Sequence, residues 1–226
     1  MLASPSHEVR ELFVTGDAAE REVDLLRAAA RRDVPVLLVD DRVARSLADT
    51  VHPQGVVAVV DLPRHRIDEV LRRRPRLLTV LCGVADPGNA GTVIRTADAA
   101  GSDAVVLTRG CTDPYAGKCV RAAAGSLFHL PVVTGVTPAT TIDAIRDAGL
   151  SVLAATTDGE LLDDVEEVLA APTAWLFGNE AHGLDPVVAA AADRRVRVPI
   201  HGRAESLNLA AAAAVCLYAS AREQRR

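Results

Sequence analysis

The sequence has very few aromatic residues: one Trp, two Tyr and three Phe among 226 residues. Apolar residues nevertheless make up 49% of the chain, and most of them are Ala, Val and Leu. A chain with this apolar content can bury a sizeable core, which excludes wholesale disorder. Short aliphatic runs are typical of strands in a parallel sheet that helices cover. The composition therefore favours an α/β fold.

Cysteines, membrane-length segments and a secretory signal are also scarce or missing. The four cysteines do not have the short spacings of zinc sites: Cys82, Cys111, Cys119 and Cys216. The longest apolar run, residues 207–219, is shorter than the roughly 20 residues of a membrane span and includes Asn208. No signal peptide opens the chain. We expect a soluble cytoplasmic protein with reduced thiols and no metal site.

Positive charge is not in excess, since the formal net charge is −5. Residues 1–80 are neutral overall, so the remainder carries the whole negative charge. Arginines cluster locally, at Arg64 and Arg66 and again in residues 72–76. Such a cluster can hold phosphates even on an acidic protein, and it is equally typical of a solvated helix surface. Both interpretations stay open at this point.

Strand and helix patterns alternate in the first part of the chain. Short buried strands are expected at residues 34–39 and 55–60, after a strand at 12–14. A helix is expected at residues 18–31 and another at 42–47. A polar, arginine-rich segment with two prolines, residues 63–75, is the best candidate for a domain boundary.

The second part alternates in the same way. Strands are expected at residues 77–81, 104–107, 130–133, 150–154, 174–177 and 196–200. Helices are expected at residues 90–100, 119–126, 141–148 and 186–192 and over the alanine-rich C-terminal segment. This alternation predicts a parallel sheet covered on both faces, and such sheets bind ligands beyond the carboxyl ends of their strands.

Three of these strands run into loops of unusual composition. The first loop, residues 86–97, contains Asn89, which is expected to cap the following helix. Arg95 lies about a turn and a half further along that helix. An arginine there can hold a phosphate or a polarised hydroxyl, but a capped helix with a surface arginine has the same pattern.

The second loop places two glycines around Asn179, Glu180 and His182, directly after a buried strand. Neither glycine pattern matches the dinucleotide-binding fingerprint or a P-loop, so a phosphate cradle is not indicated. His182 is a candidate general base, although most loop histidines are not catalytic. No second carboxylate lies at helical spacing from Glu180, so metal catalysis is not expected.

The third loop, residues 198–209, leads into the last helix. Glu205 or Ser206 is expected to begin that helix, with Asn208 near its first turn. No Gly-x-Ser-x-Gly elbow surrounds Ser206, so the loop does not support a hydrolase triad.

In this order and at these strand ends, the three loops resemble the motifs of the SpoU (TrmH) family of SPOUT methyltransferases, over roughly residues 77–222. The matching residues are Asn89 and Arg95 in the first motif, Gly178, Asn179, Glu180, Gly183 and Leu184 in the second, and Pro199, Ser206, Leu207 and Asn208 in the third.

The resemblance implies an α/β fold whose C-terminal segment forms a deep trefoil knot. It implies an enzyme that uses S-adenosyl-L-methionine to methylate a ribose 2′-hydroxyl in RNA, with ribosomal RNA preferred to tRNA. It also implies a homodimer that pairs helices near the knot, for which the C-terminal helix offers Ala210 to Ala214, Val215, Leu217 and Tyr218.

Residue roles follow from the same resemblance. Arg95 is expected to activate the ribose hydroxyl by its charge, because an arginine is a poor base. The supporting residues are expected to be Asn89, Glu180, Ser206 and Asn208. The cofactor pocket is expected to be lined by Gly178, Val198, Ile200 and Leu207.

The resemblance also suggests the domain organisation. Residues 1–62 resemble part of an L30e-like RNA substrate-binding domain, chiefly through residues 52–58, although the usual opening strand and helix are missing. Residues 63–76 are expected to be a linker, and residues 77–226 the SPOUT methyltransferase domain.

Two other classes of protein stay open. One is a non-catalytic RNA-binding or ribosome-assembly protein with the same fold. The other is a nucleotide-dependent oxidoreductase, which would require a glycine-rich fingerprint after the first strand; that fingerprint is absent.

Overall fold

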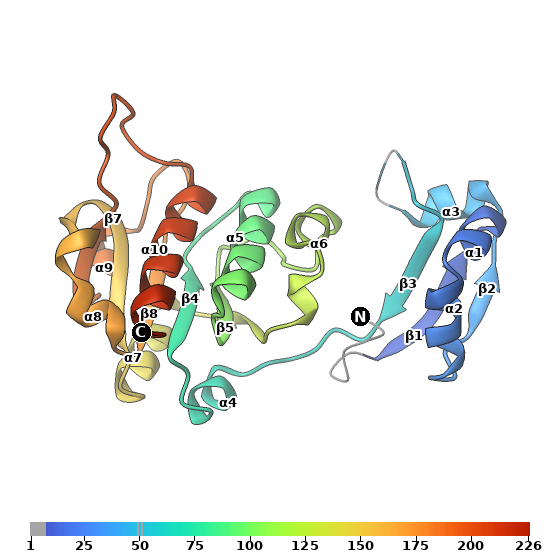
Figure 1. The fold of residues 1–226 in the computed structure, drawn as a ribbon, viewed down its shortest axis with the longest axis horizontal. Helices are drawn as coiled ribbons and strands as arrows, with labels where there is room; N and C mark the ends of the chain where they lie inside the picture. Colours follow the sequence, from blue (N-terminus) through green and yellow to red (C-terminus); the bar gives the residue numbers. More distant parts are fainter. Residues whose placement is uncertain (1–7, 49, 51) are drawn as a thin grey trace. The chain divides into compact units, whose positions relative to one another are not determined.

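The structure is a computed structural model that describes residues 8–48, 50 and 52–226. Contacts divide the chain into two compact units, Met1–Pro63 and Arg64–Arg226, which are described separately (Figure 1). Among the described residues, no helix has both the length and the apolar character needed to cross a bilayer.

The first unit is built on a three-stranded sheet in the order β2-β1-β3. Its strands are β1 (Val9–Val14), β2 (Val36–Leu38) and β3 (Val56–Val60). Its helices are α1 (Gly16–Arg21), α2 (Val23–Ala30) and α3 (Asp41–Leu47). The helix predicted at residues 18–31 is therefore two helices, because the backbone of Glu22 (φ −101°, ψ 44°) leaves the helical region between them.

The sheet of the first unit corrects two predictions. It is mixed, because β1 pairs parallel to β2 but antiparallel to β3. Strand β2 is not buried: it lies at the edge of the sheet, and Leu37 and Leu38 are 41% and 73% exposed. The small core lies instead between β1, β3 and the helices α1 and α2. The predicted parallel sheet with buried strands does not describe this unit.

The second unit contains a six-stranded sheet, in the order β6-β5-β4-β8-β7-β9, in which every strand pair is parallel. Its strands are β4 (Leu77–Leu81), β5 (Ala104–Thr108), β6 (Val132–Val136), β7 (Ser151–Leu161), β8 (Thr173–Phe177) and β9 (Arg194–Arg197). The predicted α/β fold with a parallel sheet is confirmed here.

Helices cover both faces of this sheet. They are α4 (Ile67–Arg72), α5 (Pro87–Ala100), α6 (Gly117–Ala123), α7 (Pro138–Asp147), α8 (Glu166–Ala170), α9 (Pro186–Ala190) and α10 (Leu209–Glu223), with 3₁₀ turns at Ser126–Phe128 and Leu162–Asp164. Side chains of β4 alternate between the two cores, as a strand requires. Leu77 and Leu81 join α5, α6, α8 and α10, whereas Leu78 and Val80 join α4, α7 and α9.

The segment predicted as a linker, residues 63–76, contains the short helix α4. Helix α4 packs on the second unit through Val70, which is 4% exposed, and through its neighbours Ile67 and Leu71. These three residues have i, i+3, i+4 spacing, so they share one helix face. Asp68 and Glu69 within this stripe, and the arginines before and after it, obscure it in the sequence.

Helix α10 is anchored by a polar contact inside the core. The indole N–H of Trp175 on β8 donates to the Ser220 hydroxyl at 2.9 Å, and both residues are fully buried. The Trp175 ring also stacks on Phe177, with 6.1 Å between ring centroids. The hydrogen bond between Trp175 and Ser220 fixes the position of α10 on the sheet.

The chain between β9 and α10 is a long irregular connection. It rises above the sheet before the chain returns as α10 (Figure 1). The strand predicted at residues 196–200 ends at Arg197, and α10 begins at Leu209 rather than at Glu205 or Ser206. Asn208 is its N-cap, since Oδ1 accepts the amide of Ala210 at 2.9 Å. The expected trefoil knot depends on how this segment is threaded and stays a prediction.

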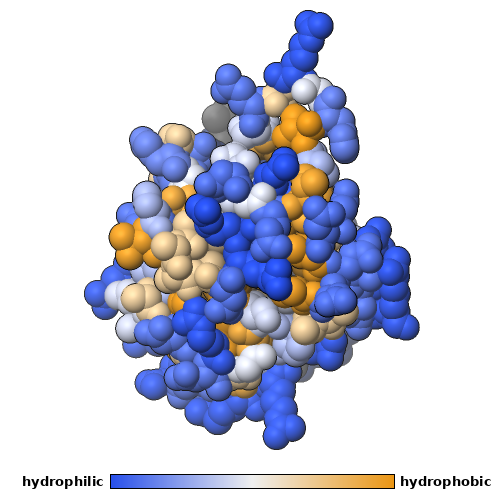
Figure 2. All heavy atoms as spheres, turned by 90° about the vertical axis from the view of Figure 1, so that its left-hand side faces the viewer, coloured by the Kyte–Doolittle hydropathy of each residue, from blue (hydrophilic) through white to orange (hydrophobic). Residues whose placement is uncertain are grey.

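Figure 2 looks onto the side that lies at the left of Figure 1, where α8 and α9 are found. Hydrophobic surface appears there in separate areas among hydrophilic side chains. Val187 on α9, 78% exposed, is one of the large apolar residues that face solvent in this part of the fold. Divided apolar surface of this kind is ordinary for a water-facing side of a protein.

Candidate active site

The candidate site lies where the order of strands in the sheet reverses. Strands β5 and β6 continue on one side of β4, and β8, β7 and β9 on the other. In open parallel sheets, such a point leaves a crevice beyond the carboxyl ends of the strands. Two hydrogen bonds join the loops after β4 and β8: the Cys82 amide donates to the Phe177 carbonyl at 2.8 Å, and Asn179 Nδ2 donates to the Gly83 carbonyl at 3.0 Å.

The loop after β8 folds tightly back on itself. Asn179 and Gly183 exchange two backbone hydrogen bonds, of 2.9 and 2.8 Å. A Cβ on Gly178 would lie 2.2 Å from the carbonyl carbon of Gly183 and from the amide nitrogen of Leu184. Backbone atoms cannot move aside as a flexible side chain can. Only glycine therefore fits at position 178 while the loop keeps this shape.

The loop after β4 is capped by a different residue from the one predicted. Asp86, not Asn89, is the N-cap of α5, because its Oδ1 accepts the Asn89 amide at 2.8 Å. Lys118 Nζ donates to the other oxygen of Asp86 at 2.7 Å, and this hydrogen bond lowers the pKa of the Asp86 carboxyl. The side chain of Asn89 is thereby released from capping.

Asn89 joins the three loops through its side chain. Its Nδ2 donates to Oε1 of Glu180 at 3.1 Å, and its Oδ1 accepts Nδ2 of Asn208 at 3.3 Å. The amide orientation of Asn208 is set by its cap bond, since its oxygen already accepts the Ala210 amide. We call these three residues the Asn89–Glu180–Asn208 bridge. It holds one residue from each of the three motifs within hydrogen-bond distance.

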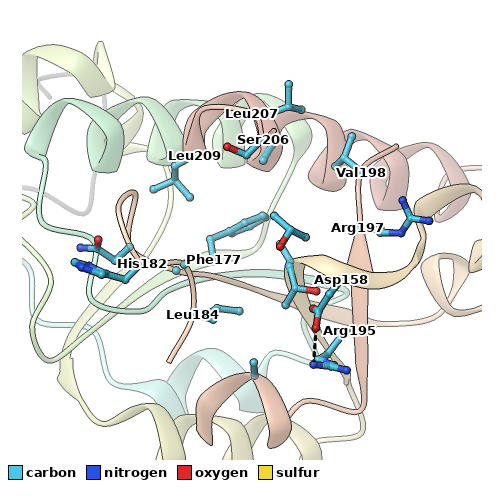
Figure 3. A pocket seen from close by; sticks show the side chains of 18 of the residues that line it. Asp158, Phe177, His182, Leu184, Arg195, Arg197, Val198, Ser206, Leu207 and Leu209 are labelled. Carbon is cyan, nitrogen blue, oxygen red and sulfur yellow. Dashed lines mark hydrogen bonds and ion pairs between the residues drawn. The ribbon is translucent and has the colours of Figure 1, made fainter. Parts of the chain in front are cut away.

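A pocket of about 790 Å³ is bounded by the middle of β7, the end of β8, strand β9 and the loops that follow β8 and β9. All four residues predicted to hold the cofactor line it: Gly178, Val198, Ile200 and Leu207. Glu180 and Ser206 line it as well, and so does His182. Figure 3 shows Ser206, Leu207 and Leu209 on one side, Leu184 on the other and Phe177 between them. Aliphatic walls and this volume suit a nucleoside-sized ligand.

The opposite end of the pocket is charged, which the sequence did not indicate. Asp158 and Arg195 form an ion pair at 3.0 Å, drawn as a dashed line in Figure 3, and Arg197 lies beside them. The residues come from β7 and β9, whose pairing is known only once the sheet order is known. Charged residues in two strands that are far apart in sequence carry no signal of their own.

The structure does not bring Arg95 to the pocket of its own chain. Arg95 lies on the exposed surface of α5 and is not among the pocket-lining residues, and its side chain makes no hydrogen bond or ion pair within the described part of the chain. Asn89 and Asn208 do not line the pocket either, but Asn89 contacts the lining residue Glu180, and Asn208 lies between the lining residues Leu207 and Leu209.

Neither metal ligands nor reactive thiols gather at this site. Among the described residues, no group of three His, Cys, Asp or Glu side chains is arranged to hold a metal ion. Burial raises the pKa of Cys82 and Cys216 to about 12 and that of Cys119 to about 11. Thiols with such pKa values stay protonated and are poor nucleophiles.

Family models match almost the whole chain. Residues 76–218 match the SpoU rRNA Methylase family, and residues 1–66 match the RNA 2′-O ribose methyltransferase substrate-binding family. The chain belongs to the SpoU rRNA methylase family. The resemblance, the fold class and the predicted enzyme class, an RNA 2′-O-ribose methyltransferase, are thereby confirmed.

Curated relatives include enzymes named for 23S rRNA. RlmP of Bacillus subtilis, a 23S rRNA (guanosine(2553)-2′-O)-methyltransferase, is 38% identical over 76% of this chain and 67% of its own length. A 23S rRNA (uridine(2479)-2′-O)-methyltransferase of Streptomyces viridochromogenes is 36% identical over 76% of this chain and 61% of its own. RlmB of Bordetella pertussis is 33% identical over 96% of this chain and 90% of its own length. The chain thus spans about two thirds of the first two relatives.

Solved structures agree with these matches. AviRb of Streptomyces viridochromogenes, a SpoU methyltransferase, superposes with a TM-score of 0.83 at 28% identity, over 97% of this chain and 83% of that one. An AdoMet-bound rRNA methyltransferase of Sinorhizobium meliloti superposes with a TM-score of 0.82 at 31% identity, over 98% of this chain and 81% of that one. AviRb was also solved in complex with AdoMet. S-adenosylmethionine, the predicted cofactor, is confirmed for the family.

The close packing of the loop after β8 predicts how a methyl group added at position 178 changes cofactor binding. Gly178→Ala should displace the loop, because its Cβ would overlap the backbone of Gly183, and should abolish measurable cofactor binding in calorimetry. Gly202→Ala is the control: it lies in the third loop, and nothing lies within 4 Å of its added Cβ. If both variants bind the cofactor like the wild type, the loop geometry described here is wrong.

Proposed function

We propose that this chain transfers a methyl group from S-adenosyl-L-methionine to a ribose 2′-hydroxyl of 23S ribosomal RNA. The observation that carries the proposal is the Asn89–Glu180–Asn208 bridge, which joins the three motif loops beside a pocket of nucleoside size. The names of the relatives support 23S rRNA rather than tRNA as the substrate.

The pocket fits the cofactor in shape and chemistry. Val198, Ile200 and Leu207 provide aliphatic walls for an adenine, and Gly178 leaves the backbone accessible to hydrogen bonds. When bound, the cofactor supplies a methyl group on a positively charged sulfur. The remaining task of the protein is to hold a ribose oxygen in line with that methyl group and to ease the loss of its proton.

Each of the four residues predicted to support catalysis has a role in this task. Glu180 and Ser206 lie at the pocket, while Asn89 holds Glu180 by a hydrogen bond and Asn208 in turn holds Asn89. Arg95 is the residue we assign to the ribose. Its guanidinium stays protonated, so it stabilises the negative charge that develops on the oxygen rather than removing the proton.

Because Arg95 does not reach the pocket of its own chain, we assign it to the pocket of a second copy in a homodimer. Two apolar residues on α10, which packs against α5, support such an interface: Val215 is 41% exposed and Tyr218 is 53% exposed. Leu217, also predicted to pair, is completely buried and belongs to the core. The dimer surface is then the outer side of α5 and α10.

RNA binding is assigned in part to arginines near the boundary of the two units. Arg66 and Arg72 are paired with Asp68, and Arg76 donates to the Ala170 carbonyl. The side chains of three others make no hydrogen bond or ion pair within the described residues: Arg64, Arg73 and Arg74. Unpaired guanidinium groups are free to bind phosphates. Residues 1–62 are assigned to substrate RNA as a partial L30e-like domain.

Two further assignments complete the proposal. The connection between β9 and α10 is part of a trefoil knot, which an experimental structure traced through residues 173–226 would show or refute. The protein works in the cytoplasm on ribosomal RNA, in line with its four free cysteines; fractionation of cells that express it with a tag would test this.

The proposed reaction predicts methyl incorporation at one ribose. Incubation with labelled S-adenosylmethionine and ribosomal RNA should yield a 2′-O-methyl nucleotide, mapped by its resistance to alkaline hydrolysis. Arg95→Ala should lower the rate by at least about a hundredfold, the usual contribution of a group that stabilises developing charge. Calorimetry should show cofactor affinity close to that of the wild type.

Three results would contradict this proposal. Methyl transfer to a base or to protein would refute the ribose assignment, and modification of tRNA alone would refute the rRNA assignment. Loss of cofactor binding in Arg95→Ala would refute the role given to Arg95.

The dimer predicts that two inactive variants complement each other. Arg95→Ala lacks the arginine, and Leu207→Trp blocks the pocket. If Arg95 acts in the partner's pocket, a mixture allowed to exchange subunits should recover about a quarter of the wild-type rate, because half of the dimers carry one intact site of two. Light scattering should give the mass of a dimer. A monomer, or a mixture that stays inactive although subunits exchange, would refute the assignment.

The free arginines predict a change in salt dependence. Replacing Arg64, Arg73 and Arg74 by Ala should weaken RNA binding and reduce the slope of log K against log salt by about 2 to 3, close to one for each lost phosphate contact. Replacing Arg66 and Arg72, already paired with Asp68, is the matched control and should change the slope less. Equal slopes for the two variants would refute the assignment.

A further inference from the structure

A ribose that enters the active site brings its base with it. The base is attached to the ribose carbon next to the one that carries the 2′-hydroxyl, so it must lie at the mouth of the pocket during methyl transfer. Proteins that bind single nucleotides of RNA commonly stack the base on an aromatic side chain or on an arginine. This chain has few aromatic residues, which leaves few candidates for such a contact.

Two residues whose side chains contain a ring line the pocket, Phe177 and His182. Phe177 is 1% exposed, and its ring stacks on Trp175 inside the core. His182 is exposed, and its side chain makes no hydrogen bond or ion pair within the described residues. The imidazole of His182 is therefore available to a ligand.

The guanidinium groups of the pocket already have partners. Arg195 pairs with Asp158 at 3.0 Å, and Arg197 Nε donates to the Gly159 carbonyl at 3.0 Å. Figure 3 shows both arginines at the opposite end of the pocket from His182. A base that stacks on a lining residue therefore has His182 as its candidate partner.

The loop after β8 holds His182 two residues from Glu180. Both lie at the tip of the turn that the pairing of Asn179 with Gly183 closes. Within this turn, Asn179 Oδ1 accepts the Ala181 amide at 2.9 Å. A side chain on a turn braced in this way loses little backbone freedom when it binds. A ribose held beside Glu180 would have its base next to His182.

We infer that His182 is a substrate-binding residue whose imidazole stacks on the base of the nucleotide that is methylated, an inference that rests on the proposed function. Every base has a flat face, so this contact holds the nucleotide at the mouth of the pocket whichever base it carries. The tip of the loop after β8 then serves the RNA through His182, while Glu180 serves the ribose.

Steady-state methylation of 23S rRNA transcribed in vitro, which carries no methyl groups, tests this inference with the full chain. His182→Ala should lower kcat/KM about five- to hundredfold, the range for one base stacked on an aromatic side chain. The loss should lie in KM with kcat nearly unchanged, because the stack is the same in the ground state and the transition state. His182→Phe keeps a flat ring and should stay within about threefold of the wild type.

His201→Ala is the matched control, because His201 is also an exposed loop histidine but does not line the pocket. It should leave kcat/KM unchanged.

Fluorescence gives a second measurement, which needs no methyl transfer. The one tryptophan of the chain, Trp175, is completely buried. His182→Trp therefore adds an exposed indole, whose fluorescence should be quenched when a base of the rRNA transcript stacks on it. His201→Trp should show little quenching. Equal quenching in the two variants would contradict the inference.

The outcomes separate this inference from the proposed function. If the wild type methylates the transcript and His182→Ala does so with the same kcat/KM, the inference is wrong and the proposed function stands. It is also wrong if His182→Phe is as impaired as His182→Ala, or if the loss lies in kcat alone, because the ring nitrogens would then matter rather than the ring face. Loss of S-adenosyl-L-methionine affinity in His182→Ala, measured by calorimetry, would contradict it as well. If the wild type does not methylate the transcript, the proposed function falls and the inference falls with it.

Discussion

The site depends on one small polar contact, the Asn89–Glu180–Asn208 bridge. Its three members come from loops that follow β4, β8 and β9, far apart in sequence, and two side-chain amides are enough to connect them. Asn89 can take part only because Asp86 caps α5 in its place. Asn208 takes part while its oxygen caps α10. The residues that cap α5 and α10 thus also determine whether the bridge can form.

Much of the second unit was predictable, because its strands are buried aliphatic runs and its helices are periodic. The first unit was less so. Residues 34–39 look the same in sequence whether a strand lies at the centre of a sheet or, like β2, at an edge. Helix α4 lies in the segment predicted as a linker, because its apolar residues Ile67, Val70 and Leu71 stand in a stretch that is otherwise charged.

The motifs predicted which residues lie at the site better than they predicted what each does. Gly178, Val198, Ile200 and Leu207 line one pocket, but no spacing indicates that Asn89 contacts both Glu180 and Asn208. Arg95 is the clearest case in which the motif does not predict the role. Its position on a helix does not indicate whether the side chain reaches the pocket of its own chain or that of a second copy.

The position of α10 has a consequence for the order of events during synthesis. Asn208 and the lining residues Leu207 and Leu209 lie next to this last helix, and Ser220 within it provides the partner of the Trp175 indole. A ribosome tunnel encloses the most recently made stretch of the chain. The strands that precede α10 can therefore pair while the pocket is still open on one side, and the binding site is completed only when α10 itself has left the tunnel.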